Sequence, residues 1–311
     1  MSEATVERLS AIEDTGETLI DNPLDALSDE QIKELGEKFD ALHEEVKADL
    51  GERDAKYIHS IIDLHRRLAL LGRALIVGSK YRPLQVSGTA VLATAKILEN
   101  MEIGHNVLHG QWDWMNDPVI NSKAWDWDNV SPADGWKFSH NYVHHTYTNI
   151  RGMDRDLGYE IMRIDPHQKW HPVFLAQPFY NLVLMAFFEY GVAMHDLDLG
   201  AIRNGTKPMR DVKMTLKAIG KKVAGQVTKD YVAFPALSGK HFKKALAANF
   251  AANIIRNVWS YSIIFCGHFP DQTYTFAFDE TELDSEDKGR WYVRQLLGAA
   301  NIDGGPLFHV M

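Results

Sequence analysis

The sequence predicts an all-α protein. Three observations support this fold class: an amphipathic pattern near the N-terminus, histidine pairs at helical spacing, and four apolar stretches of helical length. With 311 residues, the chain is long enough for one or two domains. It holds one cysteine, Cys266, so we expect neither an internal disulfide framework nor a cysteine metal site.

The first sixty residues form a separate compositional unit. Residues 1–60 hold 17 acidic and 6 basic side chains, whereas residues 61–311 hold 25 and 27. Within this segment Ser28 and Gln31 predict a capping box, and the apolar residues that follow have helical spacing. These apolar residues are Ile32, Leu35, Phe39 and Leu42. We therefore predict an acidic helical segment over 1–60, which packs on the rest of the chain or binds a partner, and one domain over 61–311.

The four apolar stretches are all interrupted by polar residues. They are Leu64–Gly78, Leu84–Ile103, Val173–Met194 and Ala245–Cys266. Mean hydropathy is −0.26, and no run of 18 purely apolar residues exists. Two interpretations stay open at this point: membrane helices whose polar residues face a bundle interior, or buried helices of a soluble protein.

The histidine clusters predict a metal site. His105 and His109 are four residues apart, as are His140 and His144, so each pair shares one face of a helix. His145 adds a third imidazole to the second cluster. Imidazole suits iron, zinc, copper and nickel. A zinc protease helix would have Glu directly after its first histidine as the general base, but the sequence has Asn there.

The two clusters and their flanking residues resemble the membrane fatty acid desaturase family. The first cluster stands in Lys96-Ile-Leu-Glu-Asn-Met-Glu-Ile-Gly-His, and Trp112-Asp-Trp-Met-Asn-Asp-Pro follows it. The second reads His140-Asn-Tyr-Val-His-His and continues as Thr-Tyr-Thr-Asn. These runs are similar to bacterial acyl desaturases, and the resemblance covers approximately residues 60–311.

The resemblance implies a membrane-embedded helical bundle with two non-haem irons on its cytosolic side. It implies iron binding by the clustered histidines and by His268, which ends the fourth apolar stretch in the place of an extra family ligand. The metal ligands would thus be His105, His109, His140, His144, His145 and His268. The implied reaction uses O2 to introduce a double bond into a fatty acyl chain carried by CoA, a carrier protein or a lipid. No side chain beyond the metal ligands is then needed as a catalytic residue.

Electrons are expected to come from another protein. The sequence has no phosphate-binding glycine loop and no dinucleotide fingerprint, so no flavin or nicotinamide module is predicted. A ferredoxin-like or flavin-containing reductase, fed by NAD(P)H, is the expected donor, and a nucleic-acid partner is not expected. The implied location is the cell membrane, as an integral protein with its active site facing the cytoplasm.

The number of membrane spans stays open. Residues 200–244 hold 11 Lys and Arg but two Asp, which favours a cytosolic position for this segment. If Val173–Met194 crosses the membrane once, the histidine clusters and this basic segment lie on opposite sides. Either that stretch is a re-entrant or two-part hairpin, or the positive-inside rule fails here.

Two alternative functions remain. A hydroxylase of alkyl chains can use the same scaffold, and a truncated, inactive chain would only bind a membrane or a partner. In the family a third histidine box follows a run that resembles residues 291–309, but the sequence stops at Met311. We therefore expect the sequence to be truncated, and the 311-residue chain by itself to be incomplete as a catalyst.

Other residues near the clusters give weaker indications. Five tryptophans fit an aromatic belt at a bilayer surface or the wall of an acyl channel: Trp112, Trp114, Trp125, Trp127 and Trp136. We expect the mixed-charge run over residues 151–159 to be a solvated loop rather than a head-group site. His195 and the acidic residues after it could support metal-bound histidines, since these commonly donate to carboxylates.

Overall fold

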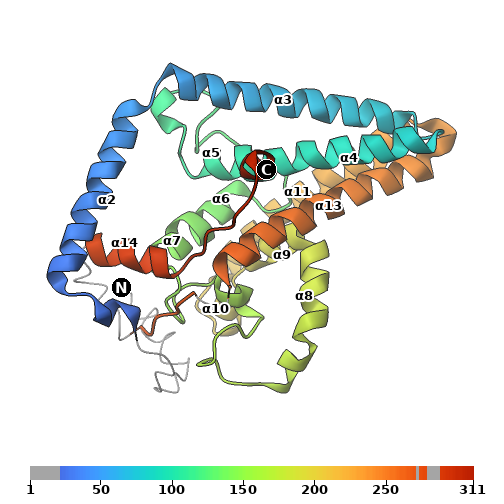
Figure 1. The fold of residues 1–311 in the computed structure, drawn as a ribbon. Helices are drawn as coiled ribbons and strands as arrows, with labels where there is room; N and C mark the ends of the chain where they lie inside the picture. The colour runs from blue at the N-terminus through green and yellow to red at the C-terminus, as the bar shows by residue number, and fades with distance from the viewer. Residues whose placement is uncertain (1–21, 271–272, 279–287) are drawn as a thin grey trace. The chain divides into compact units, whose positions relative to one another are not determined.

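The computed structural model describes residues 22–270, 273–278 and 288–311 (Figure 1). These residues form helices, loops and one isolated bridge between Ile150 and Phe276, which confirms the all-α fold class. The chain divides into two compact units built from separate segments. The first holds the residues up to Gly51 with Phe138–Asn181 and Ile263–Ile302, and the second holds Glu52–Lys137, Leu182–Ser262 and Asp303–Met311. The division at residue 60 follows composition and stays a prediction.

The helices of the first unit, some of which end beyond its limits, include the predicted amphipathic one. They are η1 (Pro23–Ala26), α2 (Asp29–Asp49), η4 (Lys137–His144), α7 (His145–Tyr147), η5 (Leu157–Glu160), η6 (Pro172–Ala176), α8 (Gln177–Ala186) and α14 (Lys288–Leu297). Ser28 caps α2 as predicted: its Oγ accepts from the Gln31 backbone N–H, and Gln31 Oε1 accepts from the Ser28 N–H.

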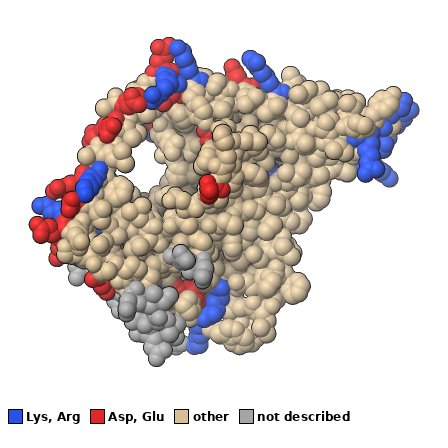
Figure 2. Space-filling view, viewed as in Figure 1, with Lys and Arg blue, Asp and Glu red and all other residues tan. Residues whose placement is uncertain are grey.

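Helix α2 packs the first part of its apolar stripe on α14, whereas Leu42 at the end of the stripe is 53% exposed. Ile32 is buried, and a Cβ on Gly36 would lie only 2.9 Å from the Gly289 Cα, so the two helices approach closely because both residues are glycine. Arg290 pairs with Asp29 at 2.6 Å. The outer face of α2 carries mixed charges that form i,i+4 ion pairs such as Lys38–Glu34 (Figure 2).

The second unit holds the longer helices. They are α3 (Glu52–Val77), α4 (Arg82–Leu98), η2 (Glu99–His105), α5 (Asn106–Leu108), η3 (Asp113–Met115), α6 (Ala133–Trp136), α9 (Phe188–His195), α10 (Leu199–Arg203), α11 (Met209–Gln226), η7 (Val227–Ala233), α12 (Phe234–Ala236), η8 (Gly239–His241), α15 (Pro306–His309) and most of α13 (Phe242–His268). In the α3–α4 hairpin, a Cβ on Gly72 would lie 2.7 Å from the Leu92 backbone N, so the helices touch through backbone. Alanines of α13 pack on the same core as Ile76 and Leu92.

Charged residues that interrupt the apolar stretches face the interior of this unit. Lys96 lies 2.9 Å from Asp230 and 3.2 Å from Asp128, and Arg256 pairs with Glu189 at 2.6 Å. Burial raises the pKa of the Asp128 and Asp230 carboxyls, but the nearby lysines outweigh it and lower both values, that of Asp128 well below its usual range. The polar interruptions thus form a paired internal network, as expected for helices with one polar face.

Within the described residues, no single helix is both long enough and apolar enough to cross a bilayer. Pro172–Ala186 and Phe188–His195 meet the criteria of length and composition together, but the chain bends by 99° between them. The Val173–Met194 stretch is therefore broken in two, which agrees with the two-part alternative. The tryptophans Trp112, Trp127 and Trp136 are buried in apolar clusters, so the aromatic-belt interpretation is wrong for these three.

Candidate metal centre

Each histidine cluster begins on a π-helical segment, whereas His109 follows α5 and His145 begins α7. The first follows α4 directly, as η2 (Glu99–His105), and the second is η4 (Lys137–His144). The sequence predicted helices here, and the structure confirms helical backbone with the wider i→i+5 hydrogen bonding. Such π-segments are frequent at functional sites. They change the direction of side chains and interrupt the regular α-helical hydrogen bonds.

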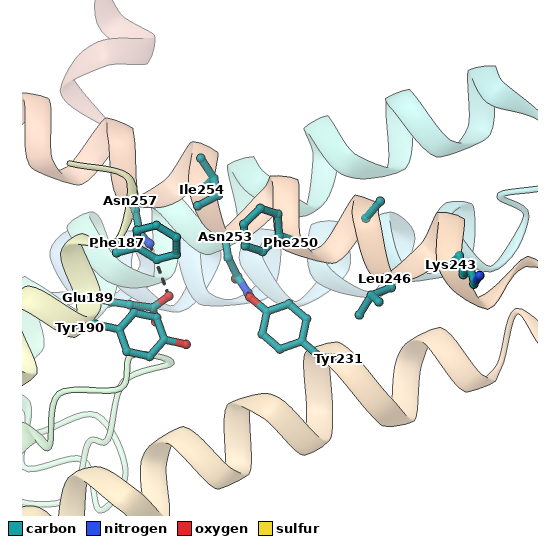
Figure 3. Close-up of a pocket in the computed structure, with 11 residues that line it drawn as sticks. Phe187, Glu189, Tyr190, Tyr231, Lys243, Leu246, Phe250, Asn253, Ile254 and Asn257 are labelled. Carbon is teal, nitrogen blue, oxygen red and sulfur yellow. Dashed lines mark hydrogen bonds between the residues drawn. The ribbon is translucent and has the colours of Figure 1, made fainter. Parts of the chain in front are cut away.

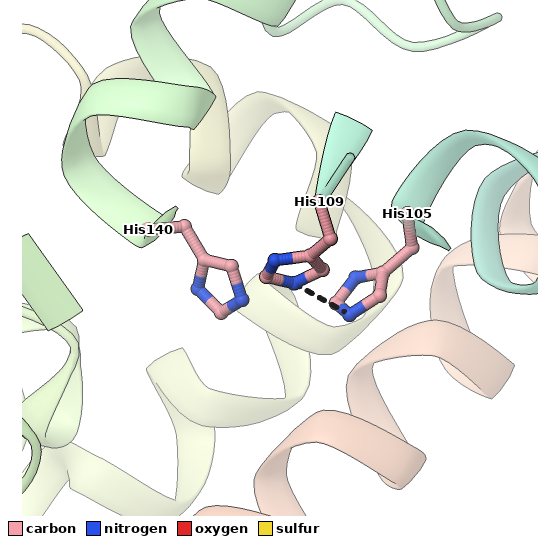
Figure 4. A group of neighbouring side chains, drawn as sticks. All are labelled: His105, His109 and His140. Carbon is pink, nitrogen blue, oxygen red and sulfur yellow. Dashed lines mark hydrogen bonds between the residues drawn. The ribbon is translucent and has the colours of Figure 1, made fainter. Parts of the chain in front are cut away.

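The first cluster brings two imidazoles together in the second unit. His105 Nε2 and His109 Nε2 lie 3.1 Å apart (Figure 4). The indole of Trp136 meets both rings edge-on, with centroids 5.3 Å from each. This arrangement holds two nitrogen atoms side by side against an apolar wall, which is a geometry that suits a shared cation.

The second cluster brings three imidazoles together in the first unit. The His140 and His144 rings are nearly parallel, with centroids 5.1 Å apart and an interplanar angle of 14°. His145 meets both rings edge-on at 4.9 and 5.1 Å. His140 and His144 are buried, so water is largely excluded from their nitrogens.

Two carboxylates orient these imidazoles through their Nδ1 atoms. His140 Nδ1 lies 3.0 Å from Asp156 Oδ2, and His144 Nδ1 lies 2.9 Å from Asp154 Oδ2. Asp154 is itself fixed, because its carboxylate accepts backbone N–H bonds from Asn149 at 2.8 Å and from Asp156 at 2.9 Å. A carboxylate on Nδ1 keeps the proton there and leaves Nε2 as the metal-binding atom.

Sequence reasoning missed Asp154 and Asp156. Both stand in the run over residues 151–159 that was expected to be a solvated loop, yet Asp154 is buried and Asp156 is half-buried. The available signal was two acidic residues shortly after a histidine box, since metal-binding histidines favour carboxylate partners. Beside His195, for which the sequence predicts the same supporting role, Asp196 accepts from Ser131 Oγ at 2.7 Å.

The end of α13 brings His268 to the second cluster. Its Nε2 lies 3.2 Å from His144 Nε2, and its Nδ1 lies 2.7 Å from the Ile264 carbonyl oxygen. Burial lowers the pKa of His268 to about 4, and the neighbouring His144 adds to this shift. Burial also lowers the pKa of His144, but Asp154 and Asp156 outweigh it and raise the value to about 9. The pKa of His144 therefore lies above that of His268, although the two rings are neighbours.

The donor atoms of the second cluster fit a metal ion. One ligand atom each from His140, His144 and Asp156 lie within 4.8 Å of one another. His145 and His268 stand directly beside this set. Because Asp156 already contacts His140 Nδ1 at 3.0 Å, the imidazole Nε2 atoms are the ligands left for a metal, and imidazole suits iron as well as zinc and copper.

Helix α14 clamps the backbone at the end of the second cluster. The buried Arg294 donates to the carbonyl oxygens of Thr148 and Thr146, at 3.0 Å each. Trp291 Nε1 donates to the His145 carbonyl at 3.3 Å. These bonds satisfy carbonyl groups that a helix end leaves without partners, so α14 fixes the position of the cluster.

Two further sequence features have other roles. Glu102 lies three residues before His105, the spacing that carboxylate-bridged helical di-iron proteins use. In the structure its carboxylate accepts from Tyr57 Oη and from Asn106 Nδ2.

His167 is buried and contacts Asp165 through Nδ1 at 2.7 Å, which makes it part of a separate ion-paired loop.

Comparison with known proteins gives matches along most of the chain. Two curated proteins of Mycobacterium tuberculosis, from strains CDC 1551 and H37Rv, are described as NADPH-dependent stearoyl-CoA 9-desaturase. Each is 46% identical over 289 residues, which are 92% of this chain and 67% of the relative. An sn-1 linoleoyl-lipid 6-desaturase of Synechocystis is 31% identical over 121 residues, which are 38% of this chain and 33% of that protein. No family model and no solved structure matches the chain.

Proposed function

The chain belongs to the fatty acid desaturase family, and on this premise we propose that it is a membrane-bound, iron-dependent stearoyl-CoA desaturase supplied with electrons from NADPH. As a member of this family, it is an oxidoreductase that introduces a double bond into a fatty acyl chain. The acyl-CoA substrate, position 9 and the use of NADPH follow the names of the mycobacterial relatives.

We propose that two irons are held by His105, His109, His140, His144, His145 and His268. The single observation that carries this proposal is the pair of carboxylate–imidazole contacts, His140–Asp156 and His144–Asp154. When bound, iron supplies the O2-dependent removal of two hydrogens from adjacent methylenes. The chain contributes the rest: the two aspartates fix the tautomer of their histidines, and burial keeps water from the imidazoles.

We also propose that the protein is embedded in the cell membrane with the site on the cytoplasmic side. Support comes from the apolar side chains that η6 and α8 present to their surroundings, in a region with few charges (Figure 2). Exposed apolar residues there are Leu175, Phe179, Leu182 and Val183. A contiguous exposed apolar face of this kind is uncommon on soluble monomers and favours contact with lipid.

The electron donor is proposed to be a separate ferredoxin-like or flavin-containing reductase. Sequence patterns for nicotinamide or flavin binding are missing from the chain, while the mycobacterial relatives are named as NADPH-dependent.

The proposal is tested by expressing the chain with a reductase system and analysing the acyl chains by mass spectrometry. We expect bound iron in the purified chain, and a new double bond at position 9 of stearoyl chains once the chain is extended by a third histidine-box segment from a relative. A His140→Ala/His144→Ala variant should lose both, because two of the proposed ligands are gone. Full iron retention in that variant would contradict the site, and hydroxylated instead of unsaturated chains would contradict the reaction.

A further inference from the structure

Basic side chains gather at one end of the second unit, where the turn between α3 and α4 meets the start of α13. Figure 2 shows them at the right of the view, without acidic side chains among them. This group, the basic end, consists of Lys80, Arg82, Lys240, Lys243 and Lys244, and all of them are exposed. Two hydrogen bonds join its two segments. Gln85 Nε2 donates to the Lys244 carbonyl at 2.9 Å, and Lys244 Nζ donates to the Lys80 carbonyl at 3.4 Å.

Acidic side chains do not balance these charges. The sequence has no Asp or Glu between residues 64 and 98 or between residues 231 and 270, and these two ranges include both segments. Within the described part of the chain, none of the five bases pairs with a carboxylate. Arg82 and Lys243 also stand in the first turns of α4 and α13, where the helix itself contributes partial positive charge. The basic end is therefore a concentrated positive charge that the chain leaves uncompensated.

Apolar side chains are interleaved with these bases. Tyr81 stands between Lys80 and Arg82 with 59% of its surface exposed, and Lys80 Nζ lies 5.2 Å from the centre of its ring. Val86 on α4 and Leu237, shortly before the second segment, are 60% and 66% exposed. At a bilayer surface, aromatic rings lie at the level of the head groups, and lysine stems cover apolar surface while their ammonium groups reach outwards. The composition of the basic end fits such a surface.

An apolar hollow of about 720 Å³ adjoins the basic end along α13 (Figure 3). Lys243 stands at one end of its wall, and Leu246 and Phe250 follow along the helix. The hollow adds apolar surface next to the bases. A partner that is anionic at one end and apolar at the other matches this combination.

We propose that the basic end binds the phosphate head groups of anionic phospholipids in the bilayer, with Tyr81 and Leu237 at the level of the head groups. The proposal rests on the membrane location proposed above. A bilayer is favoured over a soluble acidic protein or free phosphate, because it also covers the exposed apolar side chains. The iron site is separate: Arg82 begins and His105 ends the continuous helical run of α4 and η2, so the two residues lie roughly 30 Å apart.

The test uses the full chain purified in mild detergent and native mass spectrometry with two probes. Phosphatidylglycerol carries a net negative charge, and phosphatidylcholine with the same acyl chains carries none. Both lipids are added in equal amounts, and the bound molecules of each are counted. We expect phosphatidylglycerol to be retained in excess, because its head group alone brings an unbalanced negative charge to the basic end.

Variants separate the basic end from the rest of the surface. A base beside an anionic lipid surface contributes about fivefold to binding, and exposed charges are partly screened, so Lys80→Gln/Lys240→Gln should reduce the preference about tenfold. Lys80→Arg/Lys240→Arg keeps both charges and should retain the preference. Lys33→Gln/Lys38→Gln is the matched control, since it removes the same charge from α2, where both lysines pair with glutamates. This control should leave the preference unchanged.

Three results of this experiment would overturn the proposal. The first is equal retention of both lipids by the unmodified chain, and the second is an equal loss in the α2 control, which would show an effect of net charge alone. The third is loss of the preference when phosphate replaces chloride at constant ionic strength, which would indicate a site for free anions.

The membrane location is tested separately by washing membranes of expressing cells with carbonate. A chain that is washed off would contradict that location and, with it, lipid binding at the basic end. A chain that stays in the membranes but shows no lipid preference would contradict this proposal alone.

Discussion

Asp154 offers the sharpest test of the candidate metal centre, because it would support iron binding without touching the iron. Replacing it with Asn keeps the shape but removes the negative charge that faces His144 Nδ1 at 2.9 Å. Loss of such a partner usually weakens metal binding about 10–100-fold, or roughly 1.4–2.7 kcal/mol. Asp156 also lies 3.8 Å from His144 Nδ1 and would partly compensate. We therefore expect a loss near the lower limit, about tenfold.

The assay is metal affinity measured by competition with a coloured chelator, using Co²⁺ or Fe²⁺ without O2. Asp165→Asn is the matched control, since Asp165 contacts His167 Nδ1 at 2.7 Å in the same unit but belongs to a separate loop. The control should bind metal as the unmodified chain does. Unchanged affinity in Asp154→Asn would refute the reasoning, as would an equal loss in both variants, which would indicate general destabilisation.

Three further predictions follow. Arg294→Met leaves the carbonyls of Thr146 and Thr148 without their buried donor, so the free energy of unfolding should fall by about 3 kcal/mol in denaturant titrations; unchanged stability would show that the clamp is dispensable. Asp128 and Asp230 have lowered pKa values in the folded chain, so their stabilising contribution is present above about pH 4 and is lost as the pH falls below it. In thermal melts, Asp128→Asn should lose less stability than the unmodified chain as the pH falls. The same dependence of stability on pH in both proteins would contradict the stabilising role of this network. Finally, purified chain with NADPH and O2 alone should form no double bonds, because its electrons are expected from a separate reductase; sustained product formation in that mixture would exclude an external donor.

The elements that sequence reasoning predicted well are those with local signals. The capping box of Ser28 and Gln31 and the apolar stripe after it depend on neighbours within two turns, and α2 forms as expected. His268 was placed near the clusters through resemblance, and the structure brings it to His144. Its role as a ligand stays a proposal.

The features that escaped prediction depend on tertiary context. Histidines four residues apart fit an α-helix and a π-helix equally well, so their spacing could not reveal the π-segments. Asp154 became recognisable only once the chain had turned back on His144, because sequence distance does not show which acid meets which imidazole. The 99° bend before α9 likewise could not be predicted from a proline, because the residue at the bend is Phe187.

In the π-helical segments, a change that raises the stability of the fold would lower its metal affinity. Relative to an α-helix, each accommodates an extra residue, and deleting one residue would allow the regular bonding pattern to return. In η4, a deletion between His140 and His144 would rotate every following side chain by about 100°, the angle between successive residues in an α-helix, and would carry His144 away from His140. A variant selected only for heat resistance could therefore gain thermal stability and lose its metal affinity. Stabilising this scaffold for use as a catalyst requires that these two short stretches be held constant while the rest of the chain is changed.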